Sequence, residues 1–423
     1  MITFISYLHN QSELVASIRS KRFANLLRIN FEKFDLISQS NGIPFIVEPD
    51  STDEHTINRE FRTFNSQLER EGSLALKTIL LLRKIVNIVI GEWSWLWSIR
   101  LVFFLNEYVP KRQPRLIIIT GGPFLPFLAV LLLCSFRKIP YVLDYRDSFT
   151  SNPNSTWYQK PALLVWSLIE LLIVKKAALL ITASQAIADS FRCTSAKCIV
   201  IYNFPSRKYA ATFPAPRQKN HTTFNEHNFK LIYAGSMFRV NNLSPLCKAL
   251  ELLDYDLLQH TEFHYYGLSS TYVRKIFDKY GLKRLLRDHG LQTKSVVLSA
   301  LAYSNLAICT AYSSNKNPSK LHKGEITTKI FDYILAGVPT IVVAPLDFEL
   351  HKILCYINSP NIFSVSPCNI SSFAGYITRI ANTSLPSIKY QTLSVDSRLD
   401  NKVFQLTDSS DLLFLNTIKA LIK

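Results

Sequence analysis

Short apolar runs rich in β-branched residues alternate with helix-length segments along two stretches of the chain. The first stretch begins at Leu116, where LIIIT, YVLD and LLITA are separated by segments of helical composition. The alternation stops near Tyr202, restarts at Lys230 and continues to Val343. Strands that alternate with helices of ten or more residues form βαβ units and a parallel sheet. The pattern therefore predicts an α/β protein with two doubly wound domains.

A polar, proline-containing segment separates the two stretches. Residues 205–228 include Pro205, Pro214 and Pro216 and have no periodic apolar pattern, which is typical of a linker. We predict an N-terminal Rossmann-like domain over residues 1–206, a linker over 207–228 and a C-terminal Rossmann-like domain over 229–405. Residues 406–423 have the pattern of an amphipathic helix that could pack back on the first domain. Two such domains place a cleft between the carboxyl ends of their sheets, where folds of this kind bind ligands.

Three apolar segments raise the question of membrane contact. The run from Leu116 to Phe136 is uncharged and long enough to span a bilayer, but its glycines and prolines favour a strand, a loop and a buried helix. Residues 77–104 cluster tryptophans beside basic residues, and residues 161–176 read PALLVWSLIELLIVKK. Either of these two could be a membrane-surface helix or a core helix, and the sequence leaves both alternatives open.

The net charge and the cysteines limit the classes of partner and the cellular compartment that we expect for this protein. The formal net charge is +17, which favours acidic partners such as anionic lipid or phosphorylated substrates. Basic residues are scattered without a nucleic-acid-binding motif, so we expect no nucleic acid. The seven cysteines form no CxxC pair, and the start MITFISYLHN lacks the basic and apolar regions of a secretory signal. We expect a cytoplasmic protein.

Several common catalytic motifs are missing. The chain has no GxGxxG, GxxxxGK[ST], HExxH or GxSxG sequence, which argues against dehydrogenase, P-loop, zincin and α/β-hydrolase chemistry. A DxD triplet occurs at Asp254 to Asp256, at the end of a helix predicted over residues 244–254, where the two carboxylates would point in different directions. We expect no metal and no cofactor.

The segment TTKIFDYILAGVPT carries the clearest local signal for a ligand site. Thr328 is placed to cap a helix predicted over residues 328–336, Gly337 to end it, and Pro339 precedes an apolar strand. Unpaired backbone N–H groups at the start of a helix, beside Lys329, could bind a diphosphate.

Several blocks, in order, resemble the family 4 retaining glycosyltransferases of bacterial surface-polysaccharide synthesis, the O-antigen and capsule type. TTKIFDYILAGVPTIVV is similar to the donor-binding helix and strand of that family, and LIYAGSMFRVNNLSPLCKAL to its phosphate-binding loop. YVLDYRDSF, ITASQAIADSF and VIYNFP resemble blocks of its amino-terminal domain. The resemblance implies the GT-B fold, two Rossmann-like domains with a cleft between them.

The resemblance assigns roles to residues of the second domain. It implies that Arg239 and Lys329 bind the donor diphosphate and stabilise the charge of the leaving nucleotide. Gly235 and Ser236 would allow the backbone to approach the donor, near Thr328. Asp332 stands where the family has the second Glu of its EX7E motif, which contacts the ribose. The first Glu would fall at Gly324, so Glu325 could serve only after a shift of one residue.

A second group of candidates lies on the acceptor side. Gly121 and Gly122 follow a predicted strand and could let backbone approach a substrate. Residues Asp144, Arg146 and Asp147 stand where a strand meets a loop; they could bind the acceptor or form an Arg–Asp pair that fixes the loop. Arg19 could contact an acceptor phosphate or lie on a solvated helix face.

The expected function is retaining transfer of a hexosyl or N-acetylhexosaminyl group from a nucleotide-diphosphate sugar, with closure of the two domains on the donor. The acceptor would be a glycan on polyprenyl diphosphate, at an anionic membrane surface on the inner face of the cytoplasmic membrane. Two alternatives stay open. One is an isomerase like the nucleotide-sugar 2-epimerases, and the other is a non-catalytic nucleotide-sugar-binding subunit.

Overall fold

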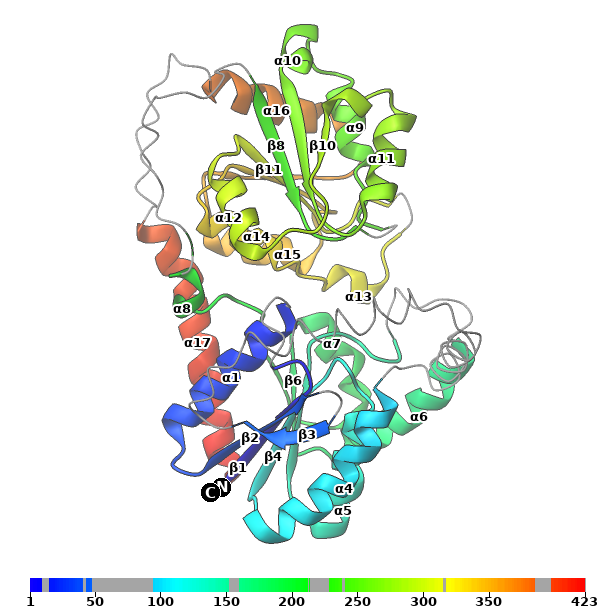
Figure 1. Ribbon diagram of the computed structural model, residues 1–423, viewed down its shortest axis with the longest axis vertical. Coiled ribbons are helices and arrows are strands. Elements are labelled where there is room, and N and C mark those ends of the chain that lie inside the picture. The colour runs from blue at the N-terminus through cyan, green and yellow to red at the C-terminus, as the bar shows by residue number, and fades with distance from the viewer. Residues whose placement is uncertain are drawn as a thin grey trace. The chain divides into compact units, whose positions relative to one another are not determined.

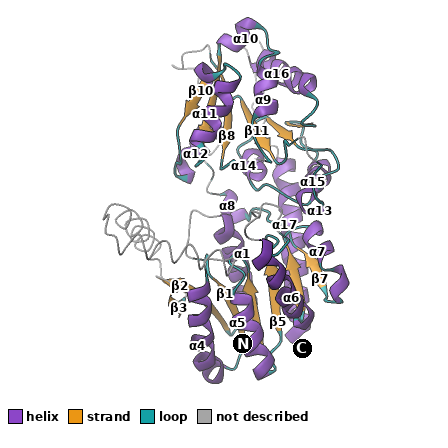
Figure 2. Ribbon diagram, turned by 90° about the vertical axis from the view of Figure 1, so that its right-hand side faces the viewer, coloured by secondary structure: helices purple, strands orange, loops and turns teal. Residues whose placement is uncertain are grey.

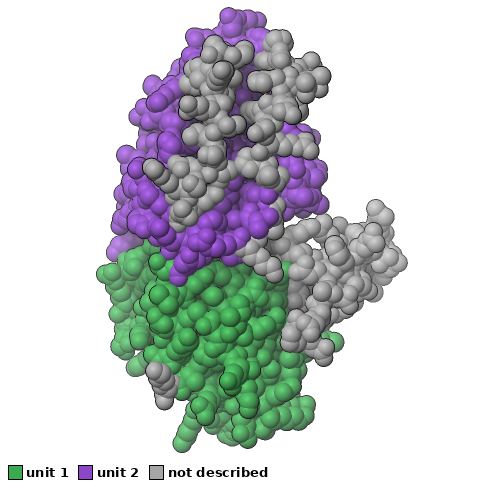
Figure 3. Space-filling model, turned by 90° about the vertical axis from the view of Figure 1, so that its left-hand side faces the viewer, with its two compact units in different colours: residues 1–203, 409–423 green, residues 204–408 purple. Residues whose placement is uncertain are grey.

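The computed structural model describes ten stretches of the chain. They are residues 1–9, 15–40, 43–47, 94–151, 160–211, 213, 228–237, 240–314, 317–384 and 397–422. The chain divides into two compact units, residues 1–203 with 409–423 and residues 204–408 (Figure 3). Most of the predicted linker and residues 77–93 of the tryptophan-rich segment lie outside the described residues.

The first unit is built on a seven-stranded sheet. Its strands are β1 (Ile2–Ser6), β2 (Phe34–Ser40), β3 (Ile43–Ile46), β4 (Leu116–Thr120), β5 (Tyr141–Tyr145), β6 (Leu179–Thr182) and β7 (Cys198–Val200). The order is β3-β2-β1-β4-β5-β6-β7, and only β3 pairs antiparallel. The order reverses between β1 and β4, so the carboxyl ends of these two strands form the switch point where such sheets bind ligands.

Helices cover both faces of this sheet (Figure 1). They are α1 (Val15–Asn30), α4 (Trp95–Arg112), α5 (Pro126–Arg137), α6 (Lys160–Lys176), α7 (Gln185–Ser190), the 3-10 turn η2 (Arg192–Thr194) and the end of α17 (Ser397–Ile422). On one face α5 packs against both α4 and α6. On the other face α1 and α17 share a core with the strands. The central strands β4 and β5 are buried along their whole length, which explains their continuous apolar sequence.

The last helix joins the first core through two specific contacts. The ring of Phe414 stacks on that of Phe23 at a centroid distance of 4.4 Å, and both side chains are fully buried. Beside them Arg22 forms an ion pair with Asp411 at 2.6 Å. Residues 409–422 are therefore part of the first unit although they follow the second unit in the chain.

The second unit has a fully parallel six-stranded sheet. Its strands are β8 (Phe229–Ala234), β9 (Thr261–Tyr266), β10 (Leu286–Asp288), β11 (Leu306–Thr310), β12 (Thr340–Val343) and β13 (Ile362–Val365). The order β10-β9-β8-β11-β12-β13 is that of a dinucleotide-binding sheet, with its switch point between β8 and β11.

Two groups of helices cover the second sheet (Figure 1). The first group is α9 (Ser244–Leu250), α11 (Ser270–Lys279) and α16 (Ile370–Ser384), which share a hydrophobic core with the strands. The second is α12 (Lys294–Ala302), α14 (Lys329–Leu335) and α15 (Glu349–Ile357). Short elements complete the unit: α8 (Arg207–Ala210), α10 (Tyr255–Gln259), α13 (Lys320–Lys323) and the 3-10 turn η3 (Lys283–Leu285).

The structure confirms the predicted fold class and corrects several boundaries. The uncharged run from Leu116 to Phe136 is β4, a loop and α5, and among the described residues no helix is long and apolar enough to cross a membrane. The helix predicted over residues 244–254 ends at Leu250, and Asp254 instead stands at the start of α10. The terminal helix begins at Ser397, well before the predicted start.

Replacing Phe414 tests how far α17 stabilises the first unit. We expect Phe414→Ala to lower the free energy of unfolding by about 3–5 kcal/mol, because it removes a buried ring and leaves a cavity against Phe23. Leu412→Ala is the matched control, since Leu412 is 60% exposed on the same helix. Urea unfolding monitored by tryptophan fluorescence measures both. Equal unfolding curves for the two variants would mean that α17 does not stabilise this core.

Candidate functional site

The switch point of the second unit brings Lys329 against the end of β8. Lys329 begins α14, and its Nζ donates hydrogen bonds to the Tyr233 hydroxyl at 2.6 Å and to the Ser236 carbonyl at 3.3 Å. The ammonium also lies 4.4 Å from the centre of the Tyr233 ring. Both hydrogen-bond partners are neutral, and within the described residues no ion pair involves Lys329. Its positive charge is therefore not neutralised by any described side chain.

The residues around Lys329 fix its position. The backbone N–H of Ala234 donates to the Tyr333 hydroxyl at 2.9 Å, which ties α14 to the end of β8. The Tyr233 hydroxyl is 3.4 Å from the Ser236 carbonyl, so one loop holds both partners of the ammonium. Burial raises the pKa of the neighbouring Cys309 thiol to about 12, against the opposing effect of Lys329. Cys309 is thus a neutral neighbour of this cation.

Gly235 is required at this place by the closeness of the lysine. Its φ is +126°, a conformation that favours glycine, and a Cβ there would lie 2.3 Å from Cε of Lys329. A Cβ on Gly267 would in turn lie 2.3 Å from the Gly235 carbonyl oxygen. The loops after β8 and β9 therefore pass each other in contact at the carboxyl edge of the sheet.

Thr328 and Asp332 do not have the environments that the sequence suggested. Thr328 occupies the N-cap position of α14 with helical dihedral angles, and its side chain makes no capping hydrogen bond, so the predicted cap is wrong. Asp332 forms an ion pair with Lys294 and accepts a hydrogen bond from the Tyr209 hydroxyl at 2.6 Å. A contact between Asp332 and a donor ribose remains a prediction.

Two other predicted donor residues are Arg239 and Glu325. Arg239 lies outside the described residues, so the diphosphate contact expected of it together with Lys329 remains a prediction. Glu325 follows α13, where its N–H donates to the His322 carbonyl at 3.0 Å and its side chain is half-buried. The structure brings Gly235, Ser236 and Lys329 together, and Glu325 keeps its predicted role only as a hypothesis.

His322 is a buried residue of the second unit that the sequence did not single out. It forms a reciprocal capping box with Ser319, and its ring lies 5.3 Å from that of Tyr312, which follows β11. Nε2 of His322 is buried and has no hydrogen-bond partner among the described residues. Burial lowers the pKa of this histidine, which favours the neutral ring. The capping pattern SxxH is degenerate, so only the tertiary structure identifies it.

Two further histidines meet at the edge of the second sheet. His264 Nδ1 and His289 Nε2 are 3.0 Å apart, and the His289 ring stacks on that of Tyr266 at 4.4 Å. Burial lowers the pKa of both histidines, consistent with one neutral ring donating to the other. The described residues contain no group of three or more metal-ligating side chains.

In the first unit Arg19 and Asp144 form a buried ion pair. Arg19 NH2 is 2.6 Å from Asp144 Oδ1, and the side chains are 3% and 0% exposed. Arg19 also donates to the carbonyl of Ile201 at 2.6 Å, and Thr120 donates to Asp144 at 2.8 Å. The alternative of a solvated helix face for Arg19 is therefore wrong. Acceptor contact by either member remains a prediction that would require the pair to open.

Arg146 fixes the loop after β4 rather than pairing with an aspartate. Its guanidinium donates to the carbonyls of Gly121 at 2.7 Å and Gly122 at 2.8 Å. Gly122 has φ +80°, and a Cβ there would lie 2.6 Å from NH2 of Arg146. Asp147 is exposed beside it. The expected Arg–Asp pair within Asp144, Arg146 and Asp147 is therefore not seen among the described residues, and Asp144 pairs with Arg19 instead.

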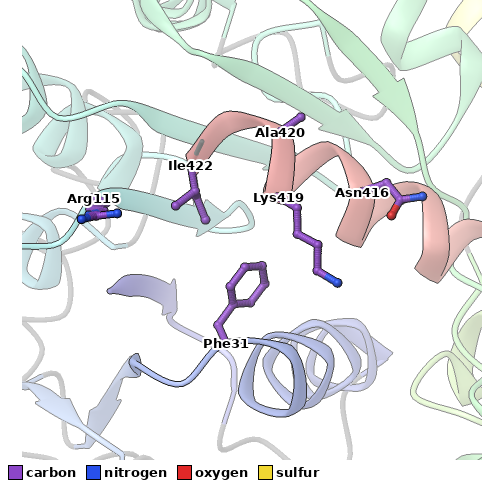
Figure 4. Close-up of a pocket in the computed structure, with 6 residues that line it drawn as sticks. All are labelled: Phe31, Arg115, Asn416, Lys419, Ala420 and Ile422. Carbon is purple, nitrogen blue, oxygen red and sulfur yellow. The ribbon is translucent and has the colours of Figure 1, made fainter.

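A cavity of about 600 Å³ lies at the opposite, amino edge of the first sheet (Figure 4). Lys419 points toward Phe31, and Arg115 lies across from them (Figure 4). Phe31 follows α1 and Lys419 is near the end of α17, so Lys419 complements the negative end of its own helix. Parallel sheets of this kind bind ligands at the carboxyl edge, and we do not place the donor in this cavity.

Solved glycosyltransferases share this fold. Sucrose-phosphate synthase from Thermosynechococcus elongatus superposes with a TM-score of 0.63 at 12% identity, over 99% of this chain and 98% of its own. HepE from Anabaena, in complex with UDP and glucose, gives 0.55 at 12% identity over 99% of each chain. A trehalose-6-phosphate synthase, studied for glycosyltransfer with retention, gives 0.56 at 10% identity over 99% of each chain.

These similarities identify the class of fold. The sequence matches no protein-family profile and no curated protein at a significant level. Because the sequence identities to these solved structures are so low, the similarity shows the fold alone. The chain has the GT-B fold of glycosyltransferases, with two sheets of parallel strands between helices, as the resemblance of its sequence blocks implied.

Removing Arg19 tests how much the buried Arg19–Asp144 pair contributes to the stability of the first unit. We expect Arg19→Ala to lower the free energy of unfolding by about 3–5 kcal/mol, because it leaves the Asp144 carboxylate buried without its counter-ion. Arg192→Ala is the control, since the Arg192–Asp189 pair is exposed and such pairs contribute about 0–1 kcal/mol. Thermal and urea unfolding measure both variants. A wild-type-like Arg19→Ala protein would show that the pair does not stabilise the fold.

Proposed function

We propose that this protein is a retaining glycosyltransferase of the family 4 type, which transfers a hexosyl or N-acetylhexosaminyl group from a nucleotide-diphosphate sugar. The observation that carries the proposal is the ammonium of Lys329, which lies beside Gly235 at the switch point of the second sheet and forms no ion pair in the described part of the chain. A cation at the carboxyl edge of the sheet, beside a glycine loop, suits a diphosphate. The GT-B fold and the UDP bound to the structurally similar HepE support this choice.

In the proposed reaction the protein stabilises the leaving group. The bond between the sugar C1 and the diphosphate oxygen breaks, and Lys329, together with Arg239, neutralises the charge that develops on the nucleoside diphosphate. The acceptor hydroxyl bonds to C1 from the same face, and its proton passes to the departing phosphate oxygen. Fixed cations take the place of a metal in this scheme, so we expect metal-independent transfer. Similarity to a trehalose-6-phosphate synthase studied for retention supports the stereochemistry.

The proposed acceptor is a glycan on polyprenyl diphosphate, in the synthesis of a surface polysaccharide. The net charge of +17 favours an anionic bilayer surface, at which a lipid-linked acceptor would be presented. The proposed place of action is the inner face of the cytoplasmic membrane. In the first unit, the carbonyl-bound Arg146 and the exposed Asp147 lie after β5 at the carboxyl edge, where we place the acceptor.

Removing the lysine tests the transferase. We expect wild-type protein to release nucleoside diphosphate from one member of a panel of UDP-, GDP- and ADP-sugars when membrane lipid extract is added. Lys329→Ala should reduce that release by about 100-fold or more, because it removes a cation that acts on the leaving group.

Lys352→Ala is the control, since Lys352 is exposed on α15 and carries the same charge change. Chelation of divalent metal in the same assay should leave the rate unchanged. A folded protein that binds a donor but releases nothing across the panel would contradict the transferase and favour a binding subunit. A product that is an epimer of the donor would favour the isomerase.

Replacing Gly235 tests nucleoside-diphosphate binding independently of turnover. We expect Gly235→Ala to weaken nucleoside-diphosphate binding by about tenfold or more, because the added Cβ must displace Lys329. Gly375→Ala is the control, because a Cβ at Gly375 meets nothing within 4 Å. Isothermal titration with UDP, GDP and ADP measures both. Unchanged affinity in Gly235→Ala would place the diphosphate elsewhere.

A further inference from the structure

Helix α6 exposes an apolar stripe from Leu164 to Leu172. Its outer face carries five aliphatic side chains that are 42% to 71% exposed: Leu164, Val165, Leu168, Leu171 and Leu172. Their spacing places them on one side of the helix. The opposite side is buried through Leu163, Ile173 and Val174. A soluble helix normally turns charged residues outward, so a stripe of this kind marks an interaction surface.

The charges of α6 are sorted in the same way. The helix has one carboxylate, Glu170, which is 5% exposed on the inner side and accepts a hydrogen bond from Thr150. Burial raises the pKa of Glu170. Two exposed lysines, Lys175 and Lys176, continue the apolar stripe at the end of the helix. The outer face of α6 therefore offers aliphatic side chains and positive charge, with no negative charge.

The neighbouring helix extends this surface. Helix α5 packs against α6 and exposes Leu132 and Phe136, which are 55% and 80% exposed. Arg137 lies over the Phe136 ring at 5.5 Å, and Lys138 follows it. No ion pair in the described part of the chain involves these two cations or the lysines of α6. The exposed residues of α5 and α6 together form an apolar, basic surface, which we call the α5–α6 face.

The chain direction aligns the basic ends of these helices. Helix α5 ends at Arg137 just before β5, and α6 ends at Lys176 just before β6. Both carboxyl ends therefore lie at the amino edge of the parallel sheet. The chain leaves the carboxyl end of β5 through Arg146 and Asp147, and the other end of α6, at Lys160, therefore lies toward the carboxyl edge. Figure 2 shows α5 and α6 beside the strands of the first sheet.

We propose that the α5–α6 face docks the protein on an anionic lipid bilayer, with α6 lying in the plane of the interface. Its aliphatic stripe enters the acyl boundary and its lysines bind lipid phosphates. The helix lies on the bilayer and does not cross it, because its inner side is part of the protein core. In this orientation the loop after β5 lies at the headgroup level, which would present a lipid-linked diphosphate to the acceptor edge. This proposal rests on the lipid-linked acceptor proposed above, but vesicle binding tests it without turnover.

Vesicle flotation of the full chain tests the docking surface. The vesicles contain phosphatidylcholine alone or phosphatidylcholine with phosphatidylglycerol. We expect the wild type to float with the anionic vesicles only. The double variant Leu168→Glu with Leu172→Glu should lower the bound fraction by about tenfold or more, because it removes apolar area and adds negative charge. Lys175→Gln with Lys176→Gln should lower it by about tenfold and make the remaining binding less sensitive to salt.

Two matched controls separate docking from general effects. Leu412→Glu with Leu413→Glu makes the same chemical change at exposed leucines of α17, and it should float like the wild type. Lys275→Gln with Lys352→Gln makes the same charge change at exposed positions of the second unit, and should also float normally. Circular dichroism and thermal unfolding establish that each variant is folded.

Three results would overturn the proposal. They are a wild type that does not float, an α6 leucine variant that floats normally, and equal losses in the α6 and α17 variants. Light scattering without lipid gives a fourth: if the α6 leucine variant converts a dimer to a monomer, the face joins two copies of the chain. Binding of UDP, GDP or ADP, titrated without lipid, separates this failure from failure of the transferase, because nucleotide binding should not change in the α6 variants.

Discussion

The candidate site depends on a lysine ammonium packed against a backbone that has no side chain. Lys329 can lie over the end of β8 only because Gly235 has no Cβ and adopts a positive φ. The Tyr233 ring and hydroxyl and the Ser236 carbonyl hold the ammonium without neutralising it. The switch point of the sheet determines where the site lies, and the contact between Lys329 and the end of β8 fixes the positive charge on which the proposed chemistry depends.

The first unit uses charge in the opposite way. Arg19 and Asp144 neutralise each other inside the protein, and the remaining hydrogen bonds of Arg19 tie α1 to the segment that follows β7. Removing one member of such a pair leaves the other charge buried without a counter-ion, so the two residues depend on each other. With these two groups satisfied, Arg146 and Asp147 are left at the carboxyl edge beside the glycine loop. The first unit therefore has a neutralised ion pair buried at β5 and exposed positive charges at the ends of α5 and α6.

Much of the fold and part of the site could be predicted from local sequence. The β-branched runs at Leu116 and Leu179 form buried strands because parallel strands are covered on both faces. The blocks around Gly235 and Lys329 were recognisable because both residues belong to short motifs. Helix ends were less predictable. Helix α9 ends at Leu250, although the apolar pattern continues beyond it, and a separate helix begins after Asp254.

Local periodicity in the sequence predicted two doubly wound domains and the strands that follow Leu116 and Lys230, and the short motifs that resemble family 4 glycosyltransferases marked Gly235 and Lys329. Only the tertiary structure decided that Arg19 pairs with Asp144, that Asp332 pairs with Lys294, and that α6 turns its leucines outward. These outcomes join residues far apart in the chain or depend on which face a neighbour covers. Pairing and burial are properties of the packed molecule, and no local pattern contains them.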